Sequence, residues 1–113
     1  MQRLAMIAGF AGLALIAVVA ASAQMALPSG NIEAGRAFAL QACSICHVVA
    51  PNQLTPPRIS NAVPFRAIAN ARGMNGMKLQ AILTTPHAVM PNLILTPEEA
   101  ADVIAYILSL RST

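Results

Sequence analysis

The sequence contains little charge, few aromatic side chains and only two cysteines. Charged residues make up 10% of the 113 residues, aromatic residues make up 4%, and tryptophan is absent. The formal net charge is only +3, and the basic residues are scattered along the chain. Proteins that bind nucleic acid cluster basic side chains and stack bases on aromatic rings, so that class of protein is excluded. The hydrophobic share of 57% also excludes a disordered chain.

Residues 1–23 hold a disproportionate share of the apolar side chains. Eighteen of these 23 residues are apolar, and one is charged. The short basic start, the apolar run and the final Ala21-Ser22-Ala23 match a secretory signal peptide. The apolar run of 18 residues lies at the lower limit of a membrane-spanning helix, which needs roughly 20. We therefore expect export to the periplasm, with membrane attachment only if residues 1–23 are retained as an anchor.

The rest of the chain has the length of one small domain, residues 32–113, preceded by a flexible lead-in, residues 24–31. Asn31 is a suitable cap for a first helix, and Thr96-Pro97-Glu98-Glu99 forms a capping box for the last. No segment alternates between apolar and polar residues as a strand does. The sequence therefore predicts an all-α fold of three to four helices, over residues 32–43, 64–70, 76–84 and 97–110.

Both cysteines lie in the stretch Cys43-Ser44-Ile45-Cys46-His47. A Cys-x-x-Cys-His arrangement is the attachment signature for c-type haem. Two thiols one helical turn apart can add to the two vinyl groups of one porphyrin, and the adjacent His47 can bind the iron as the proximal ligand. Such a cofactor would also provide the additional stabilisation that a domain with so small a hydrophobic core needs. The motif predicts one covalently attached haem c with its iron.

Three other uses of these cysteines compete with haem attachment. A disulfide between Cys43 and Cys46 would close a very small loop and stabilise little. A thioredoxin-like redox pair would sit in a βαβ pattern, which the sequence lacks. A zinc site could use both cysteines with His47 and His87, but the spacing matches no common zinc finger. Haem attachment is the interpretation that the spacing favours.

With this motif, the sequence resembles the class I c-type cytochromes. The resemblance is carried by Glu33-Ala34-Gly35-Arg36-Ala37-Phe38 with the Cys-x-x-Cys-His motif, by residues 85–93, and by Asp102-Val103-Ile104-Ala105-Tyr106-Ile107-Leu108. It implies a compact cytochrome c fold wrapped around one covalently bound haem. It also implies that the first and last helices cross closely, with Gly35 against Val103 and Tyr106. Family members often orient the ligating histidine with a carbonyl from a Gly-Pro pair, which is replaced here by Thr55-Pro56-Pro57.

The sixth ligand of the iron is expected to be the thioether of Met90. Met90 precedes Pro91, which favours an extended backbone, in a loop between two helices that could hold the sulfur opposite His47. The alternatives are Met74, Met77, His87 or an open position; Met25 lies in the lead-in. Five further apolar residues are expected to wall the haem: Phe65, Ile68, Leu79, Ile82 and Leu83.

These features predict a monomeric electron carrier rather than an enzyme, with His47 and Met90 as iron ligands and Cys43 and Cys46 as attachment points. Its partners would be redox proteins, a donor dehydrogenase and an acceptor oxidase or reductase, and no nucleic acid. Two other functions remain open. The chain could be a haem c subunit dedicated to one periplasmic dehydrogenase or oxidase, or a haem sensor or peroxidase, which would need an exchangeable sixth ligand.

Overall fold

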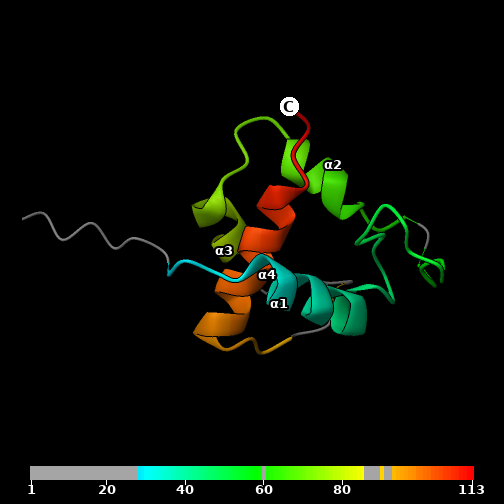
Figure 1. The fold of residues 1–113 in the computed structure, drawn as a ribbon, viewed down its shortest axis with the longest axis horizontal. Coiled ribbons are helices and arrows are strands. Elements are labelled where there is room, and N and C mark those ends of the chain that lie inside the picture. The colour runs from blue at the N-terminus through cyan, green and yellow to red at the C-terminus, as the bar shows by residue number, and fades with distance from the viewer. Residues whose placement is uncertain (1–27, 60, 86–89, 91–92) are drawn as a thin grey trace, which may run out of the picture.

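The computed structural model describes residues 28–59, 61–85, 90 and 93–113 (Figure 1). All the regular secondary structure among these residues is helical, and no strand occurs among them. The all-α prediction is therefore confirmed. The elements are α1 (Ile32–Phe38), the π-helical segment η1 (Ala39–Cys43), α2 (Phe65–Asn70), α3 (Gly76–Thr84) and α4 (Pro97–Ser109).

The helices begin where the sequence places suitable capping side chains. The Asn31 side chain accepts a hydrogen bond from the Ala34 N–H at 3.0 Å, at the start of α1. At the start of α4 the Thr96 hydroxyl accepts from the Glu99 N–H at 3.1 Å, and the Glu99 carboxylate accepts from the Thr96 N–H at 2.8 Å. Each such cap contributes about 1 kcal/mol to stability. The predicted caps of both helices are confirmed.

Helix α4 is the centre of the fold, because α1, α2 and α3 all pack against it. Figure 1 shows α1 lying across α4, and this is the most extensive contact between helices. Apolar side chains recur along α4 at helical spacing, which gives it one continuous buried face. The buried residues of that face are Ala100, Ala101, Val103, Ile104, Tyr106 and Ile107.

Two glycines allow the chain to approach α4 closely. A Cβ atom on Gly35 would collide with the carbonyl oxygen of Asp102 and would lie 2.9 Å from the Cβ of Tyr106. The predicted crossing at Gly35 is therefore confirmed, with the backbone of Asp102 as the nearest neighbour in place of Val103. Gly30 makes a second close approach, since a Cβ there would collide with the carbonyl of Ala101. At both positions the neighbouring backbone of α4 leaves no room for a side chain, so only glycine fits.

None of the helices in the described ranges is both long enough and apolar enough to cross a membrane. The expected signal peptide, residues 1–23, lies outside the described residues, as do Met25 and His87.

Candidate functional site

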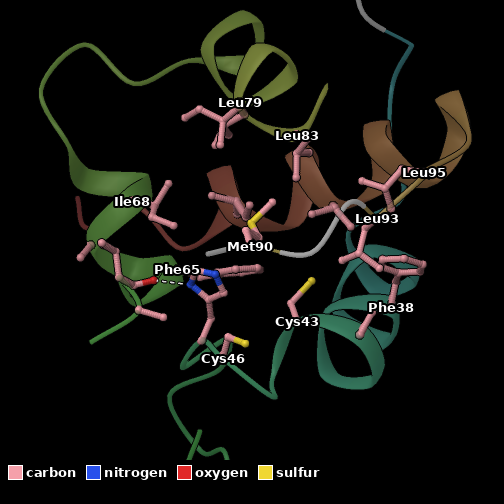
Figure 2. Close-up of a pocket in the computed structure, with 18 of the residues that line it drawn as sticks. Phe38, Cys43, Cys46, Phe65, Ile68, Leu79, Leu83, Met90, Leu93 and Leu95 are labelled. Atoms are coloured by element: carbon pink, nitrogen blue, oxygen red, sulfur yellow. Dashed lines mark hydrogen bonds between the residues drawn. The ribbon is translucent and has the colours of Figure 1, made fainter. Parts of the chain in front are cut away.

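A cavity of about 630 Å³ lies beside α4 and is lined almost entirely by apolar side chains (Figure 2). All five apolar residues expected to wall the haem line this cavity. Sequence reasoning missed several more lining residues on η1, α4 and their flanks. These are Phe38, Ala42, Leu93, Leu95, Val103 and Ile107.

The Cys-x-x-Cys-His motif enters the cavity from the end of η1. The Ser44 N–H donates to the carbonyl of Ala39, five residues back, at 3.0 Å, which is the π-helical hydrogen bond. The next turn folds back on Cys43, whose carbonyl accepts from the Cys46 N–H at 3.1 Å and the His47 N–H at 2.9 Å. This tight turn places both thiols and the imidazole along one edge of the cavity.

The two cysteines are free thiols and form no disulfide bond. Burial, together with a smaller contribution from the nearby Cys46, raises the pKa of the Cys43 thiol to about 11. A redox-active dithiol works through a thiolate, which needs a lowered pKa. The raised pKa therefore disfavours the redox-pair interpretation, whereas a buried thiol facing an apolar cavity is suited to covalent attachment of an apolar ligand.

The imidazole of His47 is oriented by a backbone carbonyl. Its Nδ1 lies 2.6 Å from the carbonyl oxygen of Val63, so Nδ1 carries the proton and donates it (dashed line in Figure 2). That arrangement leaves the lone pair of Nε2 free to bind a metal. The ring of Phe65 packs beside the imidazole, with centroids 5.4 Å apart and planes tilted by 52°. The orienting carbonyl, left open by the sequence, thus belongs to Val63 and not to the Thr55-Pro56-Pro57 segment.

Two methionines line the cavity, Met74 and Met90. In Figure 2 the Met90 side chain lies among the labelled lining residues, and it is half-buried. Met77 does not line the cavity, and its side chain is 76% exposed. The structure therefore brings Met90 together with Cys43, Cys46 and His47, and it removes Met77 from the candidate ligands.

The cavity suits a haem in both size and chemistry. Its volume falls within the range of small-molecule and cofactor sites, about 300–1,000 Å³. Its apolar walls can pack on the faces of a porphyrin, and thiols, an imidazole nitrogen and a thioether are the groups that hold haem c and its iron. No Asp, Glu, Lys or Arg side chain is among the described residues that line it. The described lining residues could therefore bind a haem and ligate its iron, but they include no pair of charged side chains for acid–base chemistry.

Comparison with known proteins agrees with this chemistry. The family model described as cytochrome c matches residues 32–111. Cytochrome c-552 from Bradyrhizobium diazoefficiens is 38% identical over 101 residues, which span 88% of this chain and 93% of that protein. No solved structure matches the chain.

Proposed function

The chain belongs to the cytochrome c family, whose members transfer electrons by means of a covalently attached haem c, and we propose that it is a one-electron carrier in the periplasm. One observation carries the proposal. Cys43, Cys46, His47 and Met90 all line a single apolar cavity of about 630 Å³. These four side chains provide two attachment points and two axial ligands, which is the complete set for a six-coordinate haem c.

Cys43 and Cys46 are proposed to form the two thioether bonds. Each S–H group adds across one vinyl double bond, so that sulfur takes one carbon and the thiol hydrogen takes the other. The addition needs no oxidant and releases no atom. Both thiols are half-buried and line the cavity, and Cys43 also packs against the hydrophobic core. The neighbouring Ile45 side chain is 53% exposed. The two attachments would therefore hold the haem beside a solvent-exposed part of the motif.

His47 and Met90 are proposed as the axial ligands. When bound, the haem supplies a ferric/ferrous couple that gains and loses one electron. The hydrogen bond from His47 to Val63 fixes the imidazole ring and increases its basicity as a ligand. The thioether of Met90 favours the ferrous state and raises the reduction potential. With both positions filled by the chain, no place on the iron is left for a substrate, as a carrier requires.

The proposed partners are a donor dehydrogenase and an acceptor oxidase or reductase. Apolar side chains near the motif are exposed: Ile45 at 53%, Val48 at 40% and Val63 at 53%. Arg58 is the only charged residue between Ala37 and Phe65. This composition supports docking through apolar contact, with little dependence of the rate on ionic strength. Residues 1–23 are proposed to act as the export signal.

Absorption spectroscopy of the purified protein tests the proposal. The reduced protein should show the bands of a low-spin haem c, and the haem should stay with the polypeptide after acid–organic extraction because it is covalently bound. The Cys43→Ala variant with Cys46→Ala should retain no haem under the same extraction. Extraction of all the haem from the unmodified protein would overturn the proposed attachment.

A further inference from the structure

The side chain of Gln53 bridges three backbone groups in the loop that follows His47. Its Oε1 accepts a hydrogen bond from the Val49 N–H at 2.8 Å. Its Nε2 donates to the carbonyl of Thr55 at 2.8 Å and, at 3.4 Å, to the carbonyl of His47 itself. A single amide group thus binds the backbone of the expected proximal ligand and of two residues that follow it, Val49 and Thr55.

The same short stretch is held from its other side by α4. The Tyr106 hydroxyl donates to the carbonyl of Val49 at 2.7 Å, and both residues are buried. The neighbouring carbonyl of Val48 accepts from the Phe65 N–H, the first residue of α2, at 2.9 Å. The peptide groups that follow His47 are therefore fixed by hydrogen bonds to a loop side chain, to α4 and to α2.

We infer that Gln53 is a positioning residue for His47, acting through the backbone of residues 47–49. The hydrogen bond from Nδ1 to Val63 is 2.6 Å long and spans 16 residues, so it depends on the placement of both ends of the loop. Gln53 joins the first end, at His47 and Val49, to the interior of the loop, at Thr55. The inference rests on the proposed ligation of the iron by His47.

Loss of Gln53 is expected to change both the position of the His47 imidazole and its strength as an electron donor. When residues 47–49 can shift, the bond from Nδ1 to the Val63 carbonyl lengthens, and the imidazole becomes a weaker electron donor. Weakening the donor removes more stabilisation from ferric iron than from ferrous iron. The reduction potential should therefore rise.

The test compares the reduction potentials of holoprotein variants by redox titration. Gln53→Leu keeps the approximate volume and removes all three hydrogen bonds, so its potential should shift upward from that of the parent. Tyr106→Phe keeps the ring and removes the bond to Val49, together with the interaction of the phenol with Arg36, so it should shift in the same direction by a smaller amount. The proton resonance of His47 Nδ1–H should move in both variants.

Thr96→Ala is the matched control. It removes the cap of α4, and Thr96 does not line the cavity, so stability should fall while the potential stays at the parent value. The inference is overturned if Gln53→Leu loses stability as this control does and keeps the parent potential. Where Gln53→Leu yields no holoprotein, an unshifted potential in Tyr106→Phe overturns it. Absence of a haem c spectrum in the parent would instead overturn the proposed function.

Discussion

The Nδ1 atom of His47 lies 2.6 Å from the carbonyl oxygen of Val63. Val63 is followed by Pro64, whose fixed φ of −61° leads directly into α2. The orientation of the expected proximal ligand is thus tied to a carbonyl 16 residues away, just before the start of α2. Since the acceptor is a main-chain atom, side-chain changes at Val63 leave it in place.

Replacement of Met90 tests the sixth ligand. The ferric protein should show the weak long-wavelength band of an iron–thioether bond, and Met90→Ala should abolish that band because the sulfur is lost. Met74→Ala is the control, since Met74 lines the same cavity. Retention of the band in Met90→Ala together with its loss in Met74→Ala would transfer the assignment to Met74.

Carbon monoxide binding separates a carrier from a sensor or peroxidase. With both axial positions occupied, the reduced protein should bind carbon monoxide slowly or not at all near neutral pH. Met90→Ala should bind it rapidly, because the substitution opens one position. Stopped-flow absorbance measures both rates. Rapid and stoichiometric binding by the unmodified protein would contradict the carrier function.

The haem should also be required for folding. Without it, the described apolar walls enclose a cavity of about 630 Å³, and such a void is costly in a domain of this size. Cys43→Ala combined with Cys46→Ala should therefore yield little folded protein in an exporting host. Circular dichroism during thermal unfolding provides the measurement. A cooperative transition in the variant without haem would show that the helices suffice alone.

The crossing of α1 and α4 should tolerate no side chain at Gly35. Gly35→Val places a Cβ against the carbonyl of Asp102, and we expect a loss of about 3 kcal/mol in the free energy of unfolding. Ala37→Val is the control, because Ala37 is exposed on the same helix. Denaturant titration measures both variants. Equal stability of Gly35→Val and its control would be inconsistent with the close crossing.

Alkaline pH should destabilise the fold through Tyr106. Burial raises the pKa of its phenol above the ordinary value of 10, an effect that nearby Arg36 partly offsets. The folded state favours the neutral phenol, so this contribution is fully present below pH 10 and is lost as pH rises through the raised pKa. As the pH rises above the ordinary phenol value of 10, the free energy of unfolding should fall more steeply for the parent than for Tyr106→Phe. Parallel curves of unfolding free energy against pH for the two proteins would contradict this prediction.

The helices could be predicted from the sequence because their starts are determined locally. Asn31 and the box of Thr96 with Glu99 lie within one turn of the N–H groups that they cap. The expected first helix, residues 32–43, was correct in extent, but its last turn is π-helical and not α-helical. The change in winding has no sequence signal of its own, since both forms use the same residue types.

The long-range contacts of the site could be predicted only in part. Gly35 was identified through the resemblance, but the equally close approach at Gly30 was missed because it lies before the first helix. The carbonyl of Val63 and the bridging role of Gln53 were missed for a different reason. Any residue offers a carbonyl, and a loop with no periodic pattern gives no indication of which one a side chain will reach.

The packing of α1 on α4 has a consequence for the biosynthesis of the domain. The Asn31 N–H donates to the Asp102 carboxylate at 2.6 Å, and the two residues are 71 positions apart. Contacts of such high sequence separation form late in folding, because a long stretch of chain must first be brought together. The core therefore cannot close before α4 has been synthesised.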